Sequence, residues 1–139
     1  MKKILLTVCT ALLVSCSVYV RAETLKPQVE ADQVKLKKTY GSALPVEAIE
    51  EKAKVLRLIA FVNSLPQKWH VPWSGPPVGK VYFEFYRDGR AVGNFYAGPD
   101  FFGRDGSDFW SQKASKKQME TLGEIVGFDL WVYIHEKRS

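Results

Sequence analysis

Cysteine is nearly absent from this chain of 139 residues, and both cysteines, Cys9 and Cys16, lie close to its beginning. Residues 17–139 therefore offer no disulfide, no thiol nucleophile and no cysteine-based zinc site. The chain has two histidines, no serine elbow and no phosphate-binding glycine loop. These absences argue against the common catalytic classes, and a fold without disulfides must be stabilised by a hydrophobic core.

A strong excess of one charge is also missing. The chain has 20 basic and 15 acidic residues, and without Lys2 and Lys3 the balance is 18 against 15, or +3. This surplus is too small to predict a nucleic-acid partner. Lys80–Tyr86 is aromatic like an RNA-stacking strand, but it lacks that motif's glycines and has Glu84 at its centre.

The first 22 residues have the pattern of an export signal. Lys2 and Lys3 precede Ile4–Val14, eleven residues without charge. The end of this run and the two residues after it, Leu13-Val14-Ser15-Cys16, resemble the lipobox of bacterial lipoproteins. The resemblance implies a signal peptide at residues 1–15 and a palmitate-type lipid anchor on Cys16. Ser17, in place of an aspartate, then favours the periplasmic face of the outer membrane. Two alternatives stay open: cleavage after Ala22 to a soluble periplasmic form, or an uncleaved anchor over Ile4–Val20.

The remaining sequence predicts one small α+β domain at residues 44–139, preceded by a lipid-anchored tether at residues 16–43. Residues 29–36 are left open as a short helix or an extra strand. We expect a four-stranded, mostly antiparallel sheet with two helices packed on one face. The expected order is a helix from Pro45 to Leu65, a hairpin over 80–98, a strand over 108–114, a helix over 115–127 and a strand over 128–135.

The expected hairpin has a turn of three residues, Arg87-Asp88-Gly89, which pairs Phe83 with Gly93 and keeps the apolar residues on one face. The alternative turn of two residues pairs Phe83 with Asn94 and places Phe95 on the opposite face. Residues 98–107 are expected to form a loop rich in glycine and aspartate.

Aromatic residues then gather on the sheet face opposite the helices, and in the loop before the third strand. The candidate protein-binding residues are Tyr82, Tyr86, Tyr96, Phe101, Phe102, Arg104, Trp110, Trp131 and Tyr133. Alternatively, Phe101 and Phe102 pack under the sheet. Trp69 and Trp73 lie in a loop rich in proline, where they either close the core or form part of a contact surface.

The leading hypothesis is an envelope-anchored protein-binding module, such as an immunity protein or an inhibitor that blocks a secreted toxin or enzyme. The alternative is a structural or assembly lipoprotein of an outer-membrane machine. A small hydrolase that uses His135 with Glu84 or Asp129 is a weaker third. No cofactor or metal is predicted, since the aspartates around Gly103 do not have the spacing of a calcium loop.

Overall fold

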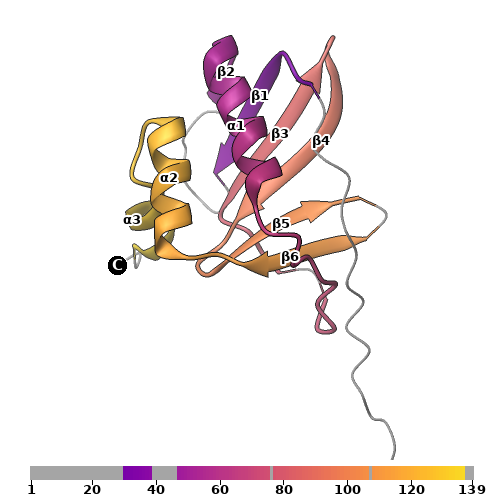
Figure 1. Cartoon of the computed structure of the whole chain (residues 1–139), viewed down its shortest axis with the longest axis vertical. Coiled ribbons are helices and arrows are strands. Elements are labelled where there is room, and N and C mark those ends of the chain that lie inside the picture. The colour runs from indigo at the N-terminus through magenta and orange to yellow at the C-terminus, as the bar shows by residue number, and fades with distance from the viewer. Residues whose placement is uncertain (1–29, 39–46, 76, 107, 137–139) are drawn as a thin grey trace, which may run out of the picture.

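The computed structural model describes residues 30–38, 47–75, 77–106 and 108–136, which form an α+β fold (Figure 1). The six strands make one antiparallel sheet in the order β2-β1-β3-β4-β5-β6, and the described residues include three helices. The α+β class is confirmed, whereas the expected four strands and two helices are too few. The elements are β1 (Gln33–Lys38), β2 (Glu47–Ile49), α1 (Lys52–Ser64), β3 (Val81–Arg87), β4 (Arg90–Ala97), β5 (Phe101–Asp105), β6 (Phe109–Lys113), α2 (Lys116–Val126) and α3 (Leu130–His135).

Strand β1 lies inside the range that the sequence assigned mostly to a tether. It pairs with β3 along its full length, and its side chains Val34 and Leu36 are buried opposite Phe85 and Phe83. The extra strand left open for residues 29–36 is therefore present, and it is a central strand of the sheet. Its burial explains why it forms, because alternating apolar and polar residues suit a strand that covers a core on one face.

The segment before α1 differs from the expectation of a helix that begins at Pro45. Pro45 lies outside the described residues, but Glu47–Ile49 is strand β2, and the helix begins only at Lys52. Ile49 pairs with Val34 and is 5% exposed. The burial of Ile49 against the sheet outweighs the helical spacing of this segment, because propensity is a weak prior against tertiary packing.

The β3–β4 hairpin corrects the expected turn. The turn has two residues, Asp88 and Gly89, with φ of 50° and 74°. Phe83 pairs with Phe95, not with Gly93 or Asn94, because the register shifts between Phe85 and Tyr86. That β-bulge restores the register that a two-residue turn alone would break, so the apolar side chains of both strands still share one face.

The expected loop over residues 98–107 is also wrong, because Phe101–Asp105 is strand β5. It pairs with β6 over five residues and with β4 at Tyr96–Gly103 and Ala97–Phe102. Strand β6 confirms the strand expected at 108–114. The glycine and aspartate content of residues 98–107 is typical of a turn, but Gly103 lies within strand β5.

The C-terminal part contains one confirmed helix and one wrong prediction. Helix α2 begins at the expected capping box, in which the Ser115 side chain accepts a hydrogen bond from the Gln118 amide at 3.2 Å, and it ends at Gly127 with φ of 87°. Residues 130–135, expected as a strand, form helix α3. Asp129 caps it by accepting from the Val132 amide at 2.9 Å. Leu130 and Ile134, four apart, are buried, which is a helical period.

The core lies between the helices and one face of the sheet, called here the inner face. Residues from all three helices and from strands β1 to β6 form one buried cluster. In Figure 1 the helices stand together on one side of the strands. None of the described helices has the length and apolar character needed to span a membrane. The opposite face of the sheet carries no described helix, and four of the nine candidate residues lie on it: Tyr82, Tyr86, Tyr96 and Phe101.

Candidate functional site

The sheet register defines the face opposite the core, called here the outer sheet face. Because side chains alternate along a strand, the residues next to the buried Phe83 and Phe85 point away from the core. Neighbouring strands bring their partners onto the same face. The outer sheet face comprises Lys35, Lys37, Tyr82, Glu84, Tyr86, Asn94, Tyr96, Phe101 and Asp105.

One half of this face is a network of charged and aromatic groups around Glu84. Lys37 Nζ lies 2.9 Å and 2.8 Å from the two carboxylate oxygens of Glu84, and the Tyr86 hydroxyl donates to the same carboxylate at 2.9 Å. Lys35 Nζ lies 4.3 Å from the centroid of the Tyr86 ring, a cation–π contact. The network holds Tyr86 in place and leaves its ring half-buried.

The hydrogen bond from Lys37, followed by the one from Tyr86, holds the pKa of Glu84 below its ordinary value near 4.5 despite partial burial. The same carboxylate raises the pKa of Lys37 above 10.5 and that of Tyr86 above 10. Each shift favours the ionic form of the Lys37–Glu84 pair and the protonated form of the tyrosine. The network is therefore intact at neutral pH.

We expect Glu84→Gln to lower the free energy of unfolding by less than about 1 kcal/mol at pH 7, since the pair is partly exposed to solvent. Because the folded-state pKa of Glu84 is lowered, its contribution is present above about pH 4.5 and is lost as the pH falls through that folded-state pKa. Urea unfolding of both proteins over a range of pH checks this. A difference that persists unchanged well below pH 4 would contradict it.

The other half of the face is an aromatic cluster packed on glycines. The rings of Tyr82 and Tyr96 stack with centroids 5.2 Å apart, and Phe101 meets Tyr96 edge-on at 6.3 Å. The Tyr96 ring lies across Gly103, where an added Cβ would be only 2.1 Å from its Cε2 atom. Tyr96 is thereby 2% exposed, and burial, with the Asp105 carboxylate nearby, raises the pKa of its hydroxyl. Tyr82 and Phe101 cover it and stay half-buried.

Asp105 and Asn94 close the edge of this cluster. The Asn94 amide nitrogen donates to Asp105 at 2.7 Å, and the Asp105 backbone amide donates to the Asn94 side-chain oxygen at 2.8 Å. This two-way contact joins β4 to β5 beyond their last paired residues, Tyr96 and Gly103. The outer sheet face is thus fixed by side-chain contacts across four adjacent strands.

Three candidate residues from the sequence do not belong to an exposed surface. Phe102 and Trp110 are 0% and 2% exposed and lie in the core. Arg104 lies on the same side of the sheet, with its Cζ atom 5.8 Å from the Trp69 ring centroid. The alternative, that phenylalanines pack under the sheet, holds for Phe102 and not for Phe101. Tyr96 is on the outer face but is covered.

Trp131 and Tyr133 lie elsewhere, because they belong to α3 and not to a strand. Trp131 stacks on His135 with ring centroids 3.8 Å apart, and Tyr133 meets Phe128 edge-on at 6.0 Å. Lys38 Nζ lies 4.7 Å from the Tyr133 centroid. These residues form a separate aromatic group beside α2. His135 Nδ1 lies 2.9 Å from the Trp131 carbonyl oxygen. The Glu84 carboxylate binds Lys37, and the Asp129 carboxylate accepts from the Val132 amide.

Sequence reasoning missed Lys35 and Lys37, which supply the cations of the outer sheet face. They lie on β1, inside the range assigned mostly to a tether. The signal that finds them is the alternation in Gln33–Lys38, where the apolar Val34 and Leu36 stand two apart between polar residues.

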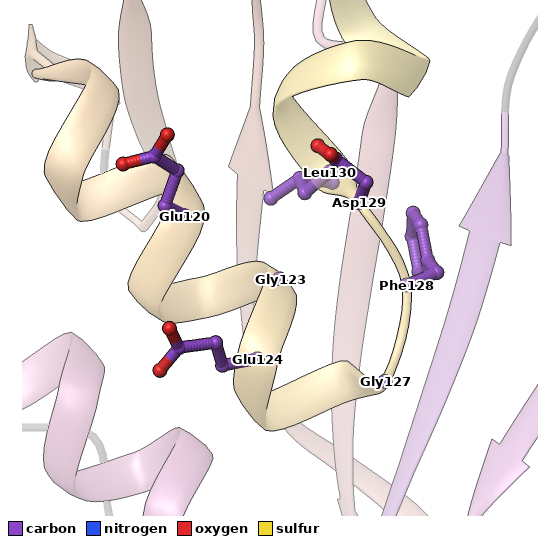
Figure 2. Close-up of a pocket in the computed structure, with 7 residues that line it drawn as sticks. All are labelled: Glu120, Gly123, Glu124, Gly127, Phe128, Asp129 and Leu130. Atoms are coloured by element: carbon purple, nitrogen blue, oxygen red, sulfur yellow. The ribbon is translucent and has the colours of Figure 1, made fainter.

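A pocket of about 460 Å³ lies between α2 and the start of α3 (Figure 2). Its lining includes the carboxylates of Glu120, Glu124 and Asp129, beside the ring of Phe128. Asp129 caps α3, and Glu120 lies 3.7 Å from Lys116. No group of three metal-ligating side chains occurs in the part of the chain that the structure describes. Two of the three carboxylates thus have structural partners.

Comparison of the chain with protein-family models, with curated proteins and with solved structures finds no match. The outer sheet face brings aromatic and charged side chains of four adjacent strands together outside the core.

Proposed function

We propose that this chain is a protein-binding module of the bacterial envelope, and that it binds its partner through the outer sheet face. The observation that carries the proposal is the position of Tyr86. Its ring is half-buried, its hydroxyl donates to Glu84 and Lys35 lies over the ring, and it belongs to β3, an interior strand of the sheet. Tyrosine in such a setting is a common energetic centre of protein interfaces.

The chemistry of the face supports a protein partner over a small ligand. Tyr82, Tyr86 and Phe101 offer broad half-exposed rings, and the Lys37–Glu84 pair offers polar groups next to them. Since the charges are already paired within the face, they need little rearrangement when water is removed. A surface that is ordered before binding loses less side-chain entropy on association.

The leader sequence sets the proposed place of action. The lipobox-like residues Leu13-Val14-Ser15-Cys16 support export and a lipid anchor on Cys16, at the periplasmic face of the outer membrane. A small non-catalytic module held there is well placed to capture a secreted toxin or enzyme and block it, as an immunity protein or inhibitor does. A role in assembling an envelope machine would use the same face on a different partner.

Tyr86→Ala is expected to weaken partner binding by at least about 2 kcal/mol, roughly thirtyfold, because it removes a half-buried aromatic ring of the outer sheet face. Tyr133→Ala is the matched control. It removes the same side chain, also half-buried and also beneath a lysine, but from α3. Quantitative mass spectrometry of proteins captured from envelope and secreted fractions by the wild type and both variants measures the effect.

If one secreted protein is captured by the wild type and by Tyr133→Ala but not by Tyr86→Ala, the blocking function is supported. The activity of that secreted protein is then assayed with and without this chain. A set of envelope components lost with the same variant supports the assembly function. Equal loss with Tyr133→Ala, or no loss with either variant, would rule out the outer sheet face as the binding surface. Circular dichroism of each variant establishes that it is folded.

A further inference from the structure

Among the tryptophans of the described residues, Trp73 is exposed to solvent to an unusual degree. The Trp73 side chain is 87% exposed, whereas Trp69, four residues earlier, is 1% exposed and lies in the core. Large aromatic side chains are rarely left so open to water, because burying one is strongly favourable. Trp69 therefore closes the core, and Trp73 is available for a contact outside the domain.

The backbone presents this indole in a defined turn. The Gly75 amide donates to the Pro72 carbonyl at 3.3 Å, so that Trp73 and Ser74 are the central residues of the turn, and Gly75 has φ of 96°. The segment projects from the body of the domain below β6 (Figure 1). Proline before the tryptophan restricts the backbone and lowers the entropy lost when the side chain is buried.

The surroundings of the turn are apolar and nearly neutral in charge. Residues 69–79 contain no lysine, arginine, aspartate or glutamate. The backbone of His70 pairs with that of Ser111, two residues from Phe109, which is 46% exposed, and Val78 is 61% exposed. Lys68, two residues before His70, and Lys113, two residues after Ser111, are also exposed. The segment that carries the turn thus combines an exposed indole with further exposed apolar side chains, and exposed lysines lie near the His70–Ser111 pair in sequence.

The length of chain before the described domain restricts what this surface can meet. Cys16 and Glu30 are fourteen residues apart. Even fully extended, that length spans at most about 50 Å, whereas a domain of this size is itself roughly 30–40 Å across. If Cys16 carries the lipid, the tether holds the domain close to the bilayer, so the bilayer is at high effective concentration for an exposed side chain of the domain.

We propose that the Trp73 turn is a second membrane contact, in which the indole of Trp73 inserts at the interface between lipid headgroups and acyl chains. Tryptophan favours this region because its ring is apolar and its N–H needs a polar partner. Lys68 and Lys113, both exposed, supply the cations that would pair with anionic headgroups. The proposal rests on the proposed lipid anchor, and it does not involve the outer sheet face.

The test uses the full chain in vesicles of phosphatidylethanolamine and phosphatidylglycerol. The emission of Trp73 is obtained as the difference between the wild type and Trp73→Phe. In vesicles we expect this difference emission to shift to the blue, to lose its quenching by aqueous iodide and to be quenched by lipids with brominated chains. Trp131→Phe is the matched control, because Trp131 is already stacked on His135 and its difference emission should not change.

Intact mass measurement of the same sample reports whether Cys16 is acylated, which separates the two proposals. An acylated chain whose Trp73 emission stays red and open to iodide overturns the insertion of Trp73 and leaves the anchor in place. If the Trp73 emission is protected from iodide although Cys16 is not acylated, the membrane contact is supported and the anchor proposal fails. Protection that appears only when envelope proteins are added to the vesicles assigns the turn to a protein partner and overturns the proposal.

Discussion

Phe102→Ala is expected to lower the free energy of unfolding by about 3–5 kcal/mol, because it removes a large side chain from the centre of the core. Phe102 is 0% exposed, and its ring centroid lies 5.1 Å from that of Phe95 and 5.8 Å from that of Phe61. The truncation loses these contacts and leaves a cavity between α1 and the sheet. Urea unfolding followed by circular dichroism measures the loss.

Phe101→Ala is the matched control for this prediction. Phe101 is the preceding residue on β5, but it lies on the outer sheet face and is only half-buried. We expect it to cost clearly less stability than Phe102→Ala. If Phe101→Ala cost more stability than Phe102→Ala, Phe101 and not Phe102 would be the residue of β5 that faces the core. The pair therefore tests the strand that replaces the loop expected from the sequence.

Gly103→Ala is expected to lower the free energy of unfolding by about 3 kcal/mol, at the upper end of the usual cost of overpacking. An added Cβ would lie 2.1 Å from Cε2 and 2.2 Å from Cζ of Tyr96. Since Tyr96 is 2% exposed and stacked on Tyr82, its ring cannot leave Gly103 without disturbing the aromatic half of the face. Thermal and urea unfolding measure the loss.

Gly106→Ala provides the control, because a Cβ added at Gly106 meets no atom within 4 Å. Its stability should stay within about 0.5 kcal/mol of the wild type. The clash also predicts coupling: after Tyr96→Ala, the further change Gly103→Ala should cost much less than it does alone. Equal costs at Gly103 and Gly106, or costs at Gly103 and Tyr96 that simply add, would show that the ring does not lie over Gly103.

The parts of the fold that the sequence predicts well are those set by local chemistry. Helix α2 follows from the Ser115–Gln118 capping box and from Gly127, each of which acts within a few residues. The hairpin follows from Asp88-Gly89 between two apolar strands. Its register was wrong because the bulge near Tyr86 depends on packing across the sheet, which a pattern within one segment does not reveal.

The parts that the sequence did not predict depend on distant partners. Strand β2 forms because Ile49 is buried against Val34, fifteen positions away, although its spacing fits a helix. Strand β5 contains Gly103, which is typical of a turn until Tyr96 covers it. In α3 only Leu130 and Ile134 are buried, and they are four positions apart. That spacing puts two residues on one face of a strand and also on one face of a helix, so the apolar pattern of residues 128–135 did not distinguish the two.

The same division applies to the candidate site. Alternation along β3 correctly placed Tyr82, Glu84 and Tyr86 on one face, because a strand fixes that pattern locally. It did not supply Lys35 and Lys37, since their position depends on which strand lies beside β3. Trp131 and Tyr133 were placed on this face only because their segment was expected to be a strand.

The most direct test of the outer sheet face is photo-crosslinking in living cells that produce the full chain. A photoreactive phenylalanine analogue is placed at position 86, and in parallel at position 133 on α3 and at position 56 on α1, where the native leucine is 51% exposed. We expect one macromolecular adduct of defined mass from position 86 and none from the other two. Adducts from position 56 or 133, with none from position 86, would contradict binding through the outer sheet face.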